Sequence, residues 1–265
     1  MHKPTKIGLR FFLLSLVIVS SGAAQSAELE DCEANPGRPT VSTPATLTPV
    51  GYLQFETGAL GARDSAEFSS RYGFNEVTKL SVTPRLELVV SAEPLVHYRS
   101  RGLSANGTAE VFLGAQAVVI HGEGAKPTIA ASYFRRVYDG GAPEVDFGSP
   151  RNSFLLLASG DVKGFHYDAN AIFNEQTQEA VHRVQFGQTL SISHHVVGKL
   201  SLSGEIWHFT QPFLRSHAVG NLWAVGYAAR KTLVLDAGFN RGLTSTSTRW
   251  EWFVGFTYLL PHRLW

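Results

Sequence analysis

The sequence predicts an exported all-β protein: a transmembrane, antiparallel, up-and-down β-barrel of about twelve strands that follows a cleaved signal peptide. Three features predict it: an N-terminal secretion signal, apolar and polar residues that alternate with a period of two, and connections that alternate between short and long. Charged residues make up only 17% of the 265 residues and glycine reaches 25, which suits a β protein with much apolar surface. With Lys+Arg at 23 and Asp+Glu at 22, the chain lacks the basic surplus of a nucleic-acid binder, so no nucleic-acid partner is expected.

The first 27 residues have the organisation of a secretory signal. Lys3, Lys6 and Arg10 precede an apolar run at 11–19, and small residues follow it. The apolar run is short for a membrane-spanning helix, so cleavage is expected between Ala23 and Ala27. Export through such a signal agrees with a place in the outer membrane of a Gram-negative-type bacterium.

An irregular periplasmic leader is predicted at 28–49, where four prolines stand among Thr, Ser, Gly and acidic residues. Whether this leader enters the barrel is left open. Cys32 is the only cysteine, which excludes an intrachain disulfide. Glu30 and Asp31 precede it, and their charge does not fit a lipid-attachment site, so Cys32 is interpreted as a free thiol.

Residues 50–265 form the predicted barrel, because successive segments alternate apolar with polar residues. In the last segment, Trp250, Trp252 and Val254 share one face, and Glu251 and Thr257 share the other. The segment at 152–159 alternates least. The twelve expected strands are 50–58, 67–83, 85–93, 109–120, 127–137, 152–159, 164–174, 180–193, 199–210, 218–229, 231–240 and 248–260.

The connections between these segments alternate in length. Those after even-numbered segments are short, such as 83–85 and 230–231, whereas 94–108 and 137–151 are long and polar. Outer-membrane barrels combine short periplasmic turns with long external loops. Several apolar stripes also end in aromatic residues, as expected at the two lipid–water boundaries. The apolar faces are therefore expected to contact lipid.

The opposite, polar stripes are expected to line the lumen. Opposite charges there would form either a constriction that selects permeants or an ion-pair ladder that closes the interior, and the sequence does not separate the two. The lumen-lining candidates are Glu56, Arg71, Lys79, Arg85, Glu87, Glu93, Arg136, Asp168, Arg183, Glu205, Asp236, Arg249 and Glu251.

Four segments carry a family resemblance: Gly51–Gly58, Thr83–Leu88, Leu235–Thr244 and Val254–Tyr258. With them the chain resembles the MetA-pathway-of-phenol-degradation family of outer-membrane transporters. The similarity spans roughly residues 50–260 and consists of loose β patterns. It implies an exported outer-membrane barrel and a role in the uptake of hydrophobic or aromatic compounds, without assigning residues to that role. Pro261 is a departure, because it is expected to interrupt the last strand before Trp265.

The predicted function is passive or weakly selective passage of small molecules, with no enzyme activity, no cofactor and no metal. The expected partners are outer-membrane lipid, the barrel-assembly machinery and a small-molecule permeant. Two alternatives stay open: a structural or adhesion barrel that acts through its loops, and an outer-membrane lipid hydrolase. His166, His182 and His208 lie on expected strands, with Ser191, Ser201 and Ser203 nearby, but no spacing selects a catalytic triad. Adjacent His194 and His195 would point to opposite faces of a strand and could not grip one ion together.

Overall fold

The computed structural model describes residues 32–143, 145 and 150–265. The predicted signal peptide lies outside the described residues. Within the described residues, no helix is long and apolar enough to cross a membrane.

The described chain is all-β, and its strands run antiparallel in one closed sheet. Each strand of the wall pairs with its neighbours in sequence, apart from the β3–β5 contact across the short β4, and the β1–β13 pairing closes the barrel. Of thirteen strands, β4 pairs only with β3, so twelve make the wall, as predicted. The strands are β1 Tyr52–Arg63, β2 Ser70–Thr83, β3 Leu86–Ser100, β4 Leu103–Gly107, β5 Val111–Ile120, β6 Thr128–Tyr138, β7 Asn152–Val162, β8 Phe165–Gln178, β9 Val181–Val197, β10 Leu200–Gln211, β11 Ser216–Arg230, β12 Leu233–Gly242 and β13 Trp250–Arg263.

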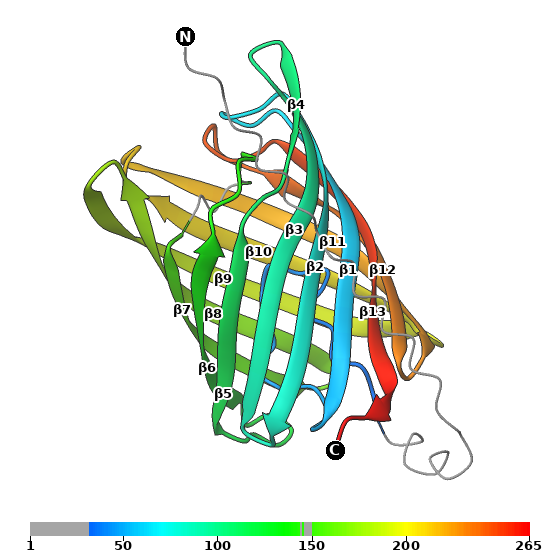
Figure 1. Cartoon of the computed structure of the whole chain (residues 1–265). Helices are drawn as coiled ribbons and strands as arrows, with labels where there is room; N and C mark the ends of the chain where they lie inside the picture. The colour runs from blue at the N-terminus through cyan, green and yellow to red at the C-terminus, as the bar shows by residue number, and fades with distance from the viewer. Residues whose placement is uncertain (1–31, 144, 146–149) are drawn as a thin grey trace.

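The two ends of the barrel differ in their connections. At one end, the turns at 84–85, 163–164, 198–199 and 231–232 have two residues each. Lys163 and Gly164 both have positive φ, the backbone that lets a two-residue turn follow the strand twist. The other end, the long-loop end, carries the longer connections, and β4 protrudes there, whereas the C-terminus lies at the short-turn end (Figure 1). Two connections depart from this rule: 121–127 at the short-turn end is long, and 179–180 at the long-loop end is short.

The prediction of a loop at 94–108 was wrong. β3 continues to Ser100 and turns back as β4. Pro94 suggested a strand end because proline lacks a backbone N–H. The strand instead accommodates it in a bulge, where Phe74 pairs with Leu95 and Glu76 pairs with Ala92.

Pro261 also lies within a strand, which corrects the expected interruption. β13 extends to Arg263, and its pairing with β1 shifts register between the Gln54–Leu259 and Tyr52–Arg263 pairs. Proline is tolerated at such irregularities because no ladder hydrogen bond is required of it there.

The apolar stripes face outward, as the alternation predicts. Val254 is 58% exposed and Ile206 54%, whereas Glu251 and Glu205, on the opposite face of the same strands, are buried. So much contiguous apolar surface is unfavourable in water and is the surface that hydrocarbon requires. In β7 both faces are apolar: Phe154 and Leu156 point outward, and Leu155 and Leu157 pack within the barrel.

Candidate functional site: a plugged lumen

The bore of the barrel is occupied by its own N-terminal segment, residues 32–49, named the plug from here on. The segment contains no helix or strand and passes between the walls of the barrel (Figure 1). Ser42 and Ala45 are completely buried, and Thr48 nearly so. The segment that the sequence indicates only as irregular therefore fills much of the lumen.

Glu205 on β10 is the strongest single anchor of the plug. Its carboxylate accepts hydrogen bonds from the backbone N–H groups of Val41 and Ser42, both at 2.7 Å, and from the Ser42 hydroxyl at 2.6 Å. Ser42 Oγ also lies 2.8 Å from Thr189 Oγ1 on β9. In a sheet, a neighbouring strand would accept hydrogen bonds from such backbone N–H groups. Here a single carboxylate accepts them, and it thereby holds an irregular segment in position.

Other lumen side chains satisfy the remaining plug backbone in the same way. Asn170 makes a two-way pair with Thr43, accepting from its N–H at 2.7 Å and donating to its carbonyl at 2.9 Å. Glu87 accepts from the backbone N–H and the hydroxyl of Thr48. Further anchors are Gln54 to Asn35, Glu56 to Gly37, Gln116 to Pro44 and Ser159 to Ala45. Because buried backbone polar groups must be paired, these side chains fix the plug's path.

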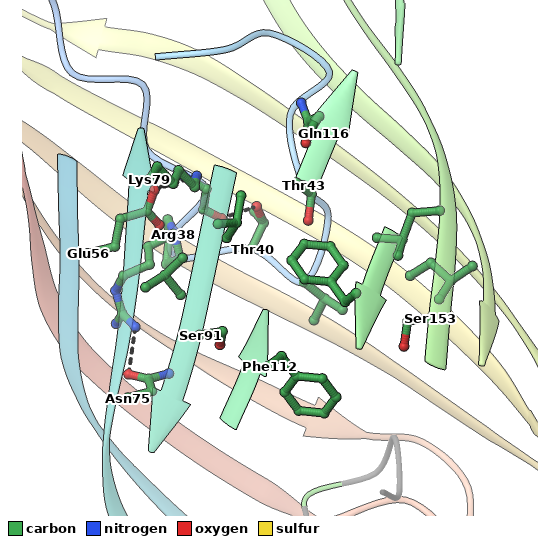
Figure 2. Close-up of a pocket in the computed structure, with 18 of the residues that line it drawn as sticks. Arg38, Thr40, Thr43, Glu56, Asn75, Lys79, Ser91, Phe112, Gln116 and Ser153 are labelled. Atoms are coloured by element: carbon green, nitrogen blue, oxygen red, sulfur yellow. Dashed lines mark hydrogen bonds and ion pairs between the residues drawn. The ribbon is translucent and has the colours of Figure 1, made fainter. Parts of the chain in front are cut away.

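Arg38 forms an ion pair between the plug and the wall. Its guanidinium donates to both oxygens of Asp236 on β12, at 3.3 and 3.2 Å, and to Asn75 Oδ1 on β2 at 2.9 Å. The Arg38–Asn75 bond is drawn in Figure 2. Since β2 and β12 lie on either side of β1 and β13, one plug side chain ties together walls that are distant in sequence.

Apolar packing adds to these polar contacts. Ala45 belongs to a buried cluster inside the bore with Leu157, Trp207 and Phe209, and Val41 packs against it. The inward apolar side chains of β7 are therefore explained by the plug that they contact. Burial of such groups contributes about 25 cal/mol per Å² removed from water.

Ten of the thirteen lumen candidates are buried or half-buried on the inner face, and three lie at the rims. The ten are Glu56, Arg71, Lys79, Glu87, Glu93, Arg136, Asp168, Glu205, Asp236 and Glu251. Arg85 is exposed in the turn between β2 and β3, Arg183 is exposed near the start of β9, and Arg249 is exposed before β13. Alternation predicts the face on which a residue lies but not its position along the barrel axis. The sequence therefore could not show that these three residues lie at the rims.

The charged groups inside the bore combine ion pairs with plug anchors. Lys79 lies 2.5 Å from Glu56, Arg136 lies 2.7 Å from Glu110, and Arg71 pairs with Glu93. Acids outnumber bases among these inner groups, and the extra carboxylates include Glu87 and Glu205, which bind plug donors instead of cations. A ladder of ion pairs therefore lies inside the bore, and a further set of carboxylates holds the plug; selection of permeants by these charges stays a prediction.

A cavity of about 440 Å³, named the lumen cavity, remains beside the plug within the barrel. Its polar side is formed by Arg38, Glu56, Asn75 and Lys79, which Figure 2 shows gathered on one side of the cavity. Its apolar lining comes from Leu60, Phe112, Phe134, Leu155, Ile172, Phe209, Leu222 and Phe253. The cavity suits a small molecule with a large apolar part and a few polar atoms.

Sequence reasoning missed the plug residues and the neutral polar side chains that hold it. Gln54, Gln116, Ser159 and Asn170 lie on the polar stripes, so their position in the alternation was a usable signal. Arg38 had no such signal, because it lies in a segment without periodicity.

The histidines and serines that suggested a hydrolase do not form a triad. Ser191 contacts Asp168 at 3.5 Å, and His166 contacts the same carboxylate at 3.3 Å. The acid thus stands between the serine and the histidine, whereas a triad requires the histidine in the middle. His194 bonds the Gly164 carbonyl and stacks on Phe165 at the short-turn end.

Among solved structures, the chain is similar to an outer-membrane channel from Pseudomonas putida F1, with a TM-score of 0.60 and 14% identity over 86% of this chain and 100% of that one. The chain has the fold of an outer-membrane channel. An anion-selective porin from Comamonas acidovorans gives a TM-score of 0.42 with 10% identity over 79% of this chain and 98% of that one, too low to add to the assignment. No family model and no curated protein matches the sequence.

Proposed function

We propose that the protein is an outer-membrane channel for passive, weakly selective passage of small molecules, and that the plug restricts this passage. The lumen cavity carries the proposal, because it is a partly polar space inside a closed barrel whose outer wall is apolar. The secretion signal supports delivery across the inner membrane, with insertion by the barrel-assembly machinery. Among the described residues, no group of three or more His, Cys, Asp or Glu side chains could hold a metal ion.

The lining of the lumen cavity favours small permeants that are partly apolar. Four phenylalanines and seven aliphatic side chains contribute to its lining, and polar side chains, among them Arg38, Glu56 and Lys79, make up most of the other lining residues. Hydrophobic or aromatic compounds, which the family resemblance implies, fit such a lining. A strongly charged solute would have to give up hydration against the apolar wall, which is costly.

Passage requires that the plug yield, because it crosses the bore and is held at several points. The plug is joined to the wall by side-chain contacts instead of a β-ladder. Each neutral contact of this kind contributes about 0.5–1.5 kcal/mol net, and each contact to a carboxylate about 1.5–3 kcal/mol. The plug is therefore suited to partial release while the hydrogen-bonded wall stays intact.

Liposome swelling with the purified full-length protein tests the proposal. Liposomes that contain the protein should swell in a small neutral aromatic alcohol. Their swelling should be faster than that of protein-free liposomes, which show only the leak of the bilayer. In a Cys32→Ser background, Ser42→Cys with Thr189→Cys would join plug and wall, since the native side-chain oxygens are 2.8 Å apart. Swelling should slow after oxidation and recover with a reductant, and Cys32→Ser alone should respond to neither.

Absence of swelling with both the full-length chain and a variant lacking residues 35–48 would contradict the channel. Equal swelling by the oxidised and reduced forms would leave a channel but would contradict control by the plug.

A further inference from the structure

Three arginines stand in one row on the outer wall near the long-loop end. Arg241 on β12 pairs in register with Trp250 on β13, and Trp250 pairs with Arg63 on β1. Arg63 pairs with Ser70 on β2, which in turn pairs with Arg99 on β3. Residues directly opposite in an antiparallel sheet share a face, and this is the outward face. The arginines occupy alternate strands, so neighbouring ones stand roughly 10 Å apart.

The row beneath these arginines is mainly aromatic, and the row after it is mainly aliphatic, with Phe74 as its one aromatic member. One step toward the middle of the barrel, Phe239, Trp252 and Tyr72 lie in register around Gly61. One step further, the corresponding row is Val225, Ala237, Val254, Ala59, Phe74 and Leu95. Cation, aromatic and aliphatic rows in this order match the passage from lipid headgroups through the interface into hydrocarbon.

The guanidiniums of this row are available to a ligand. Arg63, Arg99 and Arg241 are exposed, and within the described part of the chain none of them forms an ion pair. Arg99 Nε donates to Ser104 Oγ at 3.3 Å, and the terminal N–H groups of its guanidinium are the donors offered to a ligand. Arg241 lies over the ring of Trp250 at 4.5 Å, and Trp250 stacks on Trp252. Stacking holds the guanidinium in position while its N–H donors stay free for an anion.

A groove of about 790 Å³ runs down the outer wall from this row. Its floor is Ala59 on β1, below Arg63, and its sides are Trp252 and Val254 on β13 and Phe74 on β2, with Leu95 on β3 beyond. Between Ala59 and Arg63, the Tyr72 ring packs over Gly61, 3.3 Å from where a Cβ would stand. Because Ala59 is small between larger neighbours, the groove leaves room there for a hydrocarbon chain.

We propose that this wall binds a phosphorylated, multiply acylated glycolipid of the outer leaflet. Its phosphates contact Arg63 together with Arg241 or Arg99, and one acyl chain lies in the groove over Ala59. Guanidinium forks match phosphate oxygens, and the aromatic row lies where the headgroup meets the chains. The long-loop end is the external end, because the opposite end carries the two-residue turns typical of the periplasmic side. The lipid source is therefore the outer leaflet.

Titration of the full-length protein in mild detergent with diphosphoryl lipid A tests the site, with bound lipid counted by native mass spectrometry. The variant Arg63→Gln/Arg99→Gln/Arg241→Gln should bind about tenfold more weakly or worse, since it loses charge-assisted contacts. Arg135→Gln is the matched control: Arg135 points outward at the same end on β6, away from the row, and bonds Asn152. It should bind as the unmodified protein does.

Two further measurements distinguish the contribution of the lipid headgroup to binding from that of the acyl chain. Dephosphorylated lipid A should bind about as weakly to the unmodified protein as diphosphoryl lipid A binds to the triple variant, and inorganic phosphate should not displace bound lipid. Ala59→Phe, which fills the groove floor and keeps all three arginines, should also weaken binding. Equal binding of the phosphorylated and dephosphorylated lipids, or unchanged binding by both the triple variant and Ala59→Phe, would overturn the proposal. Because the substituted side chains point outward, the heat-modifiable gel mobility of each variant should match that of the unmodified protein.

Discussion

Removing the Glu205 carboxylate should release the plug. Glu205→Ala deletes the acceptor for the N–H groups of Val41 and Ser42 and for the Ser42 hydroxyl. Each buried donor left unsatisfied costs about 1–3 kcal/mol. The two N–H groups alone thus disfavour the docked plug by about 2–6 kcal/mol, which corresponds to roughly 30-fold to 10⁴-fold in the docking equilibrium. Glu205→Gln keeps one oxygen acceptor and nearly the same volume, so its effect should be smaller.

Thiol labelling of the plug is the direct assay. Thr43→Cys in a Cys32→Ser background places a reporter next to the anchor, and its labelling rate by a maleimide should rise at least tenfold with Glu205→Ala. Glu93→Ala is the matched control, because Glu93 is also a lumen carboxylate but pairs with Arg71 on the neighbouring strand β2. Labelling that is equally slow with Glu205 present or absent would refute the reasoning that this carboxylate holds the plug.

Three further predictions concern the lipid-facing wall, the charged plug contact and the lumen charge. Val254→Arg should lower the free energy of unfolding in liposomes by about 2–4 kcal/mol, whereas Asn221→Arg, outward in the arginine row, should cost about 0–1 kcal/mol; equal costs would contradict the membrane position. Arg38→Ala leaves Asp236 buried without its cation and should raise the Thr43→Cys labelling rate, and Arg38→Ala/Asp236→Ala should raise it less than the sum of the single changes; additive effects would argue against this pair. Because inner acids outnumber inner bases, a variant lacking residues 35–48 should prefer cations in a KCl-gradient reversal-potential measurement, and an anion preference would contradict that balance.

The wall of the barrel was predictable because each strand carries its own local signal. Alternation along Trp250–Tyr258 fixes which side chains meet lipid, and two-residue turns such as Lys163–Gly164 fix the pairing of neighbouring strands. The sequence prediction failed where proline suggested an end. Pro94 and Pro261 both lie within strands, because bulges in the pairing accommodate them.

The plugged site was beyond the reach of local signals. The plug's contacts join residues far apart in the chain, as between Arg38 and Asp236, 198 positions away. The plug's backbone bonds go to single side chains, which leave no period in the sequence. The inward apolar residues of β7 were an indirect sign of the plug in the sequence. Leu155 and Leu157 interrupt the alternation because they pack in the cluster that includes Ala45 of the plug.

Single-channel conductance in planar bilayers, compared between the full-length protein and a variant lacking residues 35–48, tests the central claim most directly. If the plug fills the bore, the unmodified protein should show small or brief openings, and the deletion should show a much larger and sustained conductance. Equal conductance of the two, with both proteins folded by heat-modifiable mobility, would contradict a lumen closed by its own N-terminal segment.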